Sequence, residues 1–159
     1  MKVNLISRDN FPSSIISIFE VLGNNGFQVY VVGGAVRDLL MGRTPHEFDL
    51  ASNAVPDEIV ELFDRTTDIG KLFGTIMVHY DEQAVEITTF RKESNYEDSR
   101  HPSSVEFSQL IHDDLKRRDF TVNAMAYNPI TEEFIDLFNG TKHLESRVLF
   151  CVGDPHERF

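Results

Sequence analysis

The spacing of apolar residues predicts a helix near the N-terminus and a strand directly after it. Across residues 12–22, Ile15, Phe19 and Leu22 recur at intervals of four and three positions, which places them on one face of a helix. The glycine- and asparagine-rich tetrapeptide that follows ends this helix, because both residue types tolerate the left-handed conformation. Residues 27–32 are mostly β-branched or aromatic, which predicts a short strand.

Further along the chain, short apolar runs are separated by turn-forming residues, and each run predicts an element. The predicted elements up to residue 63 are a turn at Gly33-Gly34, a helix at 35–41, a strand at 47–52 and a helix at 55–63 with its N-cap near Asn53. Those that follow are a hairpin of 75–80 with 84–90, a mobile loop at 91–106, a helix over at least the second half of 108–127 and a strand at 133–138. Because strands and helices do not alternate regularly, we predict the α+β class.

Composition narrows the class of protein. The 159 residues suffice for one domain, and no apolar run approaches the roughly 18 residues of a membrane span. Because Cys151 is the single cysteine, no internal disulfide can form, which favours a cytoplasmic location. The net charge of −11 is opposite to what general nucleic-acid affinity requires, so this chain alone should bind RNA poorly.

The predicted strand at 47–52 carries two acids. Side chains alternate along a strand, so Glu47 and Asp49 share one face while Phe48 and Leu50 point toward a core. Neighbouring carboxylates repel unless a cation lies between them, and Mg²⁺ binds a few carboxylates together with phosphate oxygens and water. An exposed strand face with two solvated acids explains the same pattern.

The hairpin supplies a third candidate acid. Glu86 lies on the face opposite Val85 and Ile87, and it can join Glu47 and Asp49 if the hairpin pairs beside their strand. Three carboxylates around two metal ions can drive in-line displacement at phosphorus, with one ion activating the attacking hydroxyl and the other stabilising the leaving pyrophosphate. Alternatively, Glu86 is an edge-strand residue that favours solubility. His46 is interpreted as an exposed loop residue, because no second histidine has ligand spacing.

The glycine pair suggests a phosphate site. Gly33 and Gly34 let the backbone approach a ligand closely, and the following helix presents free N–H groups at its start. Arg37 lies one turn further, where its guanidinium can bind phosphate oxygens and Asp38 can hold it. A plain tight turn with a surface Arg-Asp pair is the alternative.

Four segments together resemble one known family. They are VVGGAVRDLLMGRTPHEFDLAS (31–52), VEITTFR (85–91), DDLKRRDFTVNAMAYNP (113–129) and IDLFNGTKHLESRVLFCVGDPHERF (135–159). In this order and spacing they resemble the head domain and the start of the neck of class II CCA-adding enzymes and bacterial poly(A) polymerases. These enzymes belong to the DNA polymerase β-like nucleotidyltransferase superfamily.

The resemblance implies a nucleotidyltransferase head with a mixed, mostly antiparallel sheet and flanking helices. It implies transfer of a nucleoside monophosphate from CTP or ATP to an RNA 3′-hydroxyl, expected to be that of a tRNA, with Mg²⁺ and release of pyrophosphate. Gly33, Gly34 and Arg37 match residues near the triphosphate, and Asp49 matches a metal-binding aspartate, with Glu86 as the third carboxylate. The residues that match the motif beside the nucleotide ribose are Arg117, Arg118, Asp119 and Asn123. On a helix, Asp119 and Asn123 would share one face.

Two departures from the family pattern qualify these expectations. Glu47 stands where the family usually has aspartate, which sets the carboxylate one methylene further out and can weaken activity. The second departure is that the sequence stops where the family's neck motif would begin. We therefore expect a head domain at 1–145 and the truncated start of the neck at 146–159, with RNA contacts mainly in missing domains or a partner chain. The alternatives are a nucleotide-binding regulatory or partner module, one half of a split enzyme, and transfer to an acceptor other than RNA.

Overall fold

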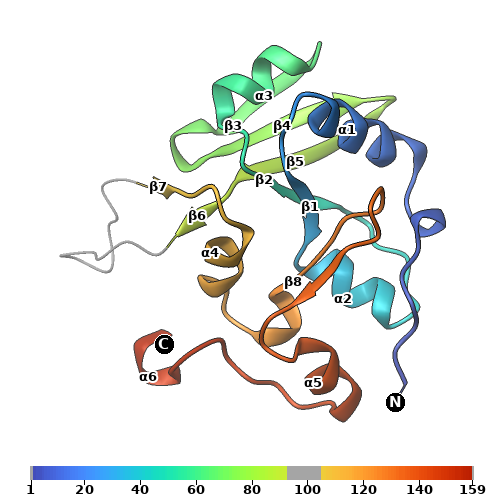
Figure 1. Ribbon diagram of the computed structural model, residues 1–159, viewed down its shortest axis with the longest axis vertical. Helices are drawn as coiled ribbons and strands as arrows, with labels where there is room; N and C mark the ends of the chain where they lie inside the picture. The colour runs from blue at the N-terminus through green and yellow to red at the C-terminus, as the bar shows by residue number, and fades with distance from the viewer. Residues whose placement is uncertain (1, 93–104, 159) are drawn as a thin grey trace.

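A mixed sheet forms the centre of the computed structural model, which describes residues 2–92 and 105–158 (Figure 1). Its seven strands lie in the order β3-β4-β5-β2-β1-β8-β9, and a separate two-stranded sheet pairs β6 with β7. Within the described residues, β2 and β5 run parallel while the other neighbouring strands run antiparallel. The predicted α+β class with a mostly antiparallel sheet is confirmed.

The strands and helices are short. The strands are β1 (Val29–Val32), β2 (Asp49–Ser52), β3 (Thr66–Gly70), β4 (Thr75–Tyr80), β5 (Gln83–Thr89), β6 (Arg91–Lys92), β7 (Glu106–Phe107), β8 (Met125–Tyr127) and β9 (Phe134–Asp136). The α-helices are α1 (Ser13–Asn24), α2 (Gly34–Leu40), α3 (Pro56–Leu62), α4 (Ile111–Lys116), α5 (Gly140–Ser146) and α6 (Pro155–Arg158), and the 3-10 helices are η1 (Arg8–Asn10), η2 (Lys71–Phe73) and η3 (Thr121–Asn123).

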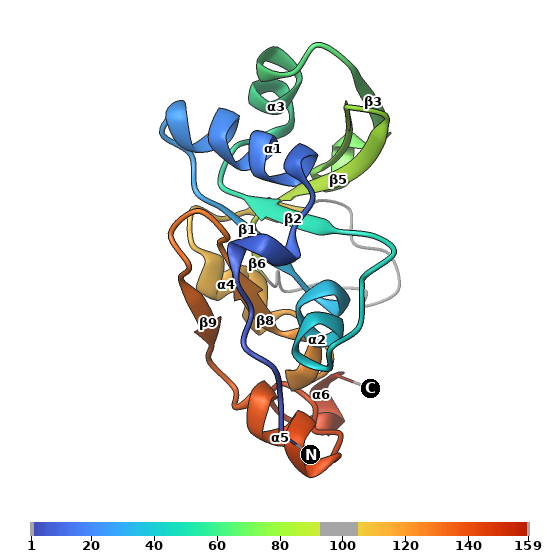
Figure 2. The same ribbon diagram turned by 90° about the vertical axis from the view of Figure 1, so that its right-hand side faces the viewer.

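The main core lies between one face of the sheet and the helices α1, α2 and α3, of which α1 and α3 stand above β2 and β5 in Figure 2. The predicted stripe of Ile15, Phe19 and Leu22 is buried there, so the periodicity that predicted α1 is confirmed. Burial of such side chains stabilises the fold by about 1.5 to 3 kcal/mol each.

A second, smaller core covers the opposite face, where α4 packs. Alternation along β1 explains why both faces are apolar: Val31 enters the main core, whereas Tyr30 and Val32 enter the second one. Ile111 and Leu115 of α4 close this second core. The sheet therefore has helices on both faces, and α4 covers the second face.

The prediction of a helix in the second half of 108–127 is wrong. The helix α4 ends at Lys116, and η3 is followed by β8, which pairs with β1 on one side and β9 on the other. The strand residues Met125, Ala126 and Tyr127 are buried. Pairing within the sheet has overridden the local helical preference of this alanine- and methionine-containing run.

Two predicted boundaries also shift. The N-cap of α3 is Val55, because the side chain of Asn53 instead accepts a hydrogen bond of 2.8 Å from the backbone N–H of Gln28. The second strand begins at Asp49, so Glu47 lies in the segment that leads into it. Glu47 and Asp49 are consequently not two positions of one regular strand.

Most of the predicted mobile loop, residues 93–104, lies outside the described residues. The segments that flank it pair antiparallel as β6 and β7. Within the described part of the chain, every helix is too short or too polar to cross a membrane.

Candidate active site

Strand pairing brings three segments to the same end of the sheet. Strand β1 is antiparallel to both β2 and β8, with Val32 opposite Asp49 and Ala126. The C-terminal end of β1 therefore adjoins the N-terminal ends of β2 and β8. Because of this, the turn at Gly33, the carboxylate of Asp49 and the side chain of Asn123 belong to one neighbourhood.

Asp49 and Glu86 lie directly opposite each other on β2 and β5. Their neighbours Leu50 and Ile87 enter the main core, so alternation puts both carboxylates on the face that carries α4. Glu86 was predicted to join Asp49 if the hairpin pairs beside the strand of Asp49, and the structure has this pairing. Glu47 does not continue the strand, but its charge acts on both other acids.

Burial and neighbouring acids raise the pKa values of Asp49 and Glu86. Partial burial raises the pKa of Asp49 although the residue is exposed overall, the charge of Glu47 raises it further, and the charge of Arg118 lowers it. Burial likewise raises the pKa of Glu86, and Asp49 and then Glu47 add to the shift. Mutual repulsion of this kind is what a bound cation relieves.

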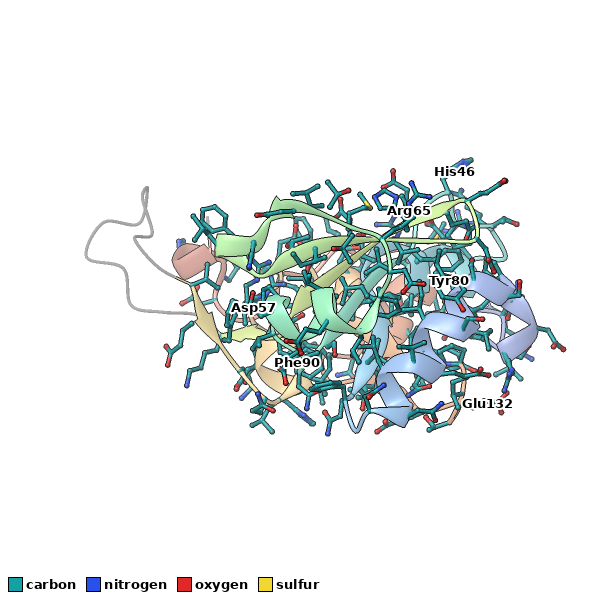
Figure 3. The ribbon with its side chains drawn as sticks, turned by 90° about the horizontal axis from the view of Figure 1, so that it is seen from above. His46, Asp57, Arg65, Tyr80, Phe90 and Glu132 are labelled. Atoms are coloured by element: carbon teal, nitrogen blue, oxygen red, sulfur yellow. The ribbon has the colours of Figure 1, made fainter. Side chains whose placement is uncertain are left out.

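These carboxylates fit a magnesium ion that shares its coordination with a ligand. Across 2–92 and 105–158, no three His, Cys, Asp or Glu side chains already form a group that could hold a metal. Mg²⁺ commonly uses only one or two carboxylates, with phosphate oxygens and water completing its octahedron. The pairing of Asp49 with Glu86 therefore suits a metal that arrives with a phosphate ligand. His46 is exposed on the preceding loop, as predicted (Figure 3).

The glycine turn lies against an arginine. Gly33 has φ of +73°, a conformation that glycine adopts easily, and a Cβ built on it would be 3.4 Å from Nη1 of Arg118. Gly34 is covered by the guanidinium of Arg37, whose Nη2 would be 3.1 Å from a Cβ at that position. Both glycines thus bring the backbone close to a positive charge.

Arg37 is held by two acceptors. Its Nη1 donates a hydrogen bond of 2.8 Å to Oδ1 of Asn123, and its Nη2 lies 3.3 Å from Oδ1 of Asp38. The predicted pairing with Asp38 is therefore confirmed. The bond to Asn123 joins the glycine turn to the segment before β8, two motifs that are 86 positions apart in the sequence.

Asp119 is separated from this group. It follows the end of α4 and precedes η3, so it does not share a helix face with Asn123 as predicted. Its carboxylate accepts a hydrogen bond of 2.6 Å from the backbone N–H of Phe120. Asn123 rather than Asp119 is thus the residue of this motif that contacts Arg37.

Asp114 was missed by the sequence analysis. It is fully buried on α4 and lies within 3.2 Å of Nε of Arg117 and 3.1 Å of Nη2 of Arg118. Burial lowers the pKa of Arg117, an effect that the charge of Asp114 opposes. In the sequence it is one of two adjacent aspartates, and only the structure, in which Asp114 is fully buried and Asp113 is partly exposed, shows which of them faces inward.

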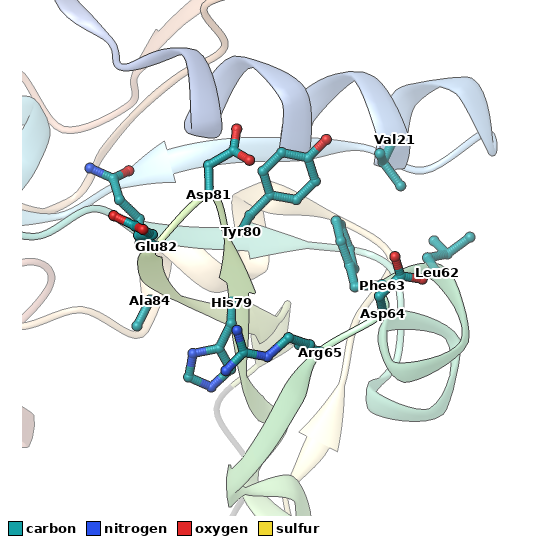
Figure 4. A pocket seen from close by; sticks show the side chains of 11 residues that line it. Val21, Leu62, Phe63, Asp64, Arg65, His79, Tyr80, Asp81, Glu82 and Ala84 are labelled. Atoms are coloured by element: carbon teal, nitrogen blue, oxygen red, sulfur yellow. The ribbon is translucent and has the colours of Figure 1, made fainter.

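A surface pocket of about 610 Å³ lies elsewhere. It is bounded by the end of α3, part of α1 and the turn between β4 and β5, with Arg65, His79 and Tyr80 among its walls (Figure 4). None of the acids, glycines or arginines described above lines it. The candidate active site is therefore the open end of the sheet rather than this pocket.

Comparison with known proteins gives a family match and close relatives. A family described as the poly A polymerase head domain matches residues 29–150. The CCA-adding enzyme of Lactobacillus helveticus is 44% identical over 158 residues, which make up 98% of this chain and 39% of that enzyme. The CCA-adding enzyme of Streptococcus thermophilus is 49% identical over 144 residues, or 91% of this chain and 36% of that enzyme.

Solved structures agree with this match. The Bacillus stearothermophilus CCA-adding enzyme in complex with CTP has a TM-score of 0.83 and 37% identity, covering 92% of this chain and 35% of its own. The Thermotoga maritima CCA-adding enzyme complexed with tRNA has a TM-score of 0.68 and 26% identity, covering 96% and 37%. The chain thus spans between 35% and 39% of the length of these four proteins.

Proposed function

The chain belongs to the poly A polymerase head domain family, and from this premise we propose that it binds CTP or ATP and transfers the nucleoside monophosphate to an RNA 3′-hydroxyl. The acceptor we favour is the 3′ end of a tRNA, because the relatives are CCA-adding enzymes and one of them is complexed with tRNA. The reaction releases pyrophosphate.

The observation that carries this proposal is the register of β2 and β5. It aligns Asp49 with Glu86 on one face of the sheet, and Arg118 and the turn at Gly33 adjoin the same end. Acids and arginines side by side are what a metal-bound triphosphate requires: the acids bind the cation, and the arginines bind the phosphate oxygens.

Each residue receives a role in this proposal. Arg37 and Arg118 bind the triphosphate, and Gly33 and Gly34 allow the phosphates to approach the backbone. We assign the nucleotide's ribose to Asn123, since its amide contacts Arg37, whereas the carboxylate of Asp119 is engaged by a backbone amide.

The acids receive two roles. Glu47, Asp49 and Glu86 would hold Mg²⁺, which when bound supplies positive charge that neutralises the phosphates and acidifies the attacking hydroxyl. We assign to Glu86 the further role of accepting the proton from the 3′-hydroxyl, because its carboxylate lies beside Asp49 on the same face of the sheet.

The body of the RNA is expected to be bound outside this chain. A net charge of −11 disfavours a broad RNA-binding surface, and the chain spans less than two fifths of its relatives. We propose residues 1–145 as the head domain and 146–159 as the start of a neck. The single cysteine supports a cytoplasmic location.

The test uses the 159-residue chain with labelled CTP or ATP, Mg²⁺ and a tRNA that lacks its 3′ end. We expect nucleotide incorporation that Asp49→Ala abolishes. Asp64→Ala is the matched control, since Asp64 is an exposed acid that lines the separate pocket. Binding of CTP and of ATP to the same chain is measured by titration in parallel.

The outcomes separate the candidate functions. Incorporation that depends on Asp49 supports the transferase. Nucleotide binding without incorporation at saturating tRNA, even after Glu47→Asp restores the usual family residue, favours a nucleotide-binding module instead. A chain that binds neither nucleotide contradicts both functions.

A further inference from the structure

The buried carboxylate of Asp114 is the least expected charge in the protein. Its side chain has no solvent exposure, and a buried charge is costly unless it is paired and hydrogen-bonded. Three donors meet it: the backbone N–H of Arg91 at 3.0 Å, Nε of Arg117 at 3.2 Å and Nη2 of Arg118 at 3.1 Å. Oδ1 accepts the first two bonds and Oδ2 accepts the third.

The bond to Arg118 leaves the rest of that guanidinium available. Arg118 uses Nη2 for Asp114, while its Nη1 faces the turn at Gly33, 3.4 Å from the position of a built Cβ. Its Nε is buried and has no hydrogen-bond acceptor within the residues that the structure describes. A buried donor without an acceptor is uncommon, and it marks a guanidinium whose hydrogen-bonding capacity the described residues do not fill.

Arg118 also lies on the side of the acids. Its charge lowers the pKa of Asp49, against the effects of burial and Glu47, so the guanidinium that pairs with the buried acid on α4 also acts on a carboxylate of the sheet. An arginine side chain has many rotamers, and an acceptor that fixes one of them reduces the entropy lost when a ligand binds.

We propose that Asp114 is a positioning residue for the triphosphate: it fixes one edge of the Arg118 guanidinium so that the other donors meet the phosphate oxygens beside Gly33. This proposal rests on the proposed function, because it concerns the same nucleotide site. Asp114 itself does not contact the nucleotide. It acts through Arg118, and its bond to the backbone of Arg91 ties α4 to the start of β6.

Removing the charge of Asp114 should weaken only the binding of ligands that carry the phosphate chain. Loss of the charge-assisted bond frees Arg118, so Asp114→Asn should weaken CTP binding by on the order of tenfold. It should weaken inorganic tripolyphosphate by the same factor, because the part of the nucleotide that Arg118 meets is the phosphate chain. Cytidine, which has no phosphate, should bind equally to both proteins.

The experiment is a calorimetric titration of CTP, tripolyphosphate and cytidine, each with Mg²⁺, into the wild-type chain and the variants. Asp113→Asn is the matched control: it is the same change at the adjacent position of α4, where the carboxylate accepts a bond of 2.6 Å from the hydroxyl of Ser108. We expect this control to bind all three ligands like the wild type. Thermal unfolding of each variant is measured alongside.

A double-mutant cycle separates positioning from general stability. If Asp114 acts through Arg118, then Asp114→Asn costs little further affinity for tripolyphosphate once Arg118→Gln is present. Arg118→Lys provides a second test that leaves the buried acid in place. A lysine ammonium that pairs with Asp114 has no rigid fork to offer the phosphates, so we expect a loss of about tenfold or more.

Several results would overturn the proposal. These are unchanged tripolyphosphate binding in folded Asp114→Asn, fully additive losses in the cycle, or wild-type affinity in Arg118→Lys. If Asp114→Asn does not fold, Asp114→Glu takes its place: it keeps the charge but moves the carboxylate by one methylene, and unchanged tripolyphosphate binding in that variant would overturn the proposal. Failure of the wild-type chain to bind CTP, ATP and tripolyphosphate would instead contradict the proposed function.

Discussion

Neutralising one carboxylate of the candidate active site should stabilise the protein when no divalent cation is present. Glu86→Gln removes one charge and preserves the size of the side chain on β5. In the wild type, burial, Asp49 and Glu47 all raise the pKa of Glu86, so its ionised form is disfavoured in the folded state. The substitution removes that unfavourable interaction.

The magnitude follows from the strand pairing. Asp49 and Glu86 are opposite one another on adjacent strands, which lie about 4.8 Å apart. Two unit charges about 5 Å apart repel by about 0.8 kcal/mol in water and about 3 kcal/mol at an effective dielectric constant of about 20. Since both residues are exposed, solvent screening favours the lower value, and we expect a gain of about 0.5 to 1 kcal/mol. That gain corresponds to a rise in Tm of about 1 to 4 °C.

The effect has a definite dependence on pH. A carboxyl group whose pKa is raised by folding favours the folded state below its unfolded pKa, and this contribution is lost as the pH rises through the folded pKa. The wild type is therefore penalised above the folded pKa of Glu86, where the carboxylate is ionised, and the advantage of Glu86→Gln should disappear in acid. Mg²⁺ should also reduce the difference, because it stabilises the wild type by binding its carboxylates.

The assay is thermal unfolding in EDTA and in Mg²⁺, at neutral and at acidic pH. Glu61→Gln on α3 is the control, since Glu61 is an exposed acid outside the candidate active site. The reasoning fails if Glu86→Gln is no more stable than the wild type in EDTA at neutral pH. It fails equally if the advantage is the same in acid, or if the control gains as much.

Two further predictions concern stability. The hydroxyl of Tyr30 donates a bond of 2.8 Å to Oε1 of Glu133, and burial followed by this bond raises the pKa of Tyr30 to about 12. Between pH 10 and 12, relative to Tyr30→Phe, the wild type should therefore lose about 2 to 3 kcal/mol of unfolding free energy in denaturant titrations, and an equal slope in both proteins would contradict this. Gly140→Ala should cost about 2 to 4 kcal/mol, because its Cβ would press into the carbonyl oxygen of Thr121. Gly23→Ala, with nothing within 4 Å of its Cβ, should be neutral or stabilising in the same unfolding assay, and similar losses in both variants would refute the steric argument.

Local patterns predicted the elements that local interactions form. The stripe of α1 and the alternation of the β4–β5 hairpin were recognised because their periodicity is contained in a single segment. The strand β3 was missed because its residues are polar or half exposed at the sheet edge. The strand β8 was mistaken for helix because its three buried residues are too few to show a period of two.

The sequence predicted individual residues of the candidate active site, but not the strand pairing that aligns them or the buried Asp114. Asp49, Glu86, Gly33 and Arg37 were each identifiable from residue type and spacing together with the family resemblance. The segments β2 and β5 are distant in the sequence, so their pairing could not be predicted from it. The sequence supported only a conditional prediction, that Glu86 joins Asp49 if the two strands pair. Asp114 gave no signal, since burial of an aspartate depends on the packing of α4 against the sheet.

The two cores also explain why the acid at the start of β2 keeps its direction. Leu50 enters the core beneath α1, α2 and α3, and Ala51 enters the core beneath α4. A slip of one residue in the pairing of β2 would exchange these two side chains and turn Asp49 toward the main core, where its unpaired charge would be costly to bury. The apolar residues of β2 therefore specify the register that brings Asp49 opposite Glu86. The same four-residue strand therefore contributes to both cores and carries one acid of the pair.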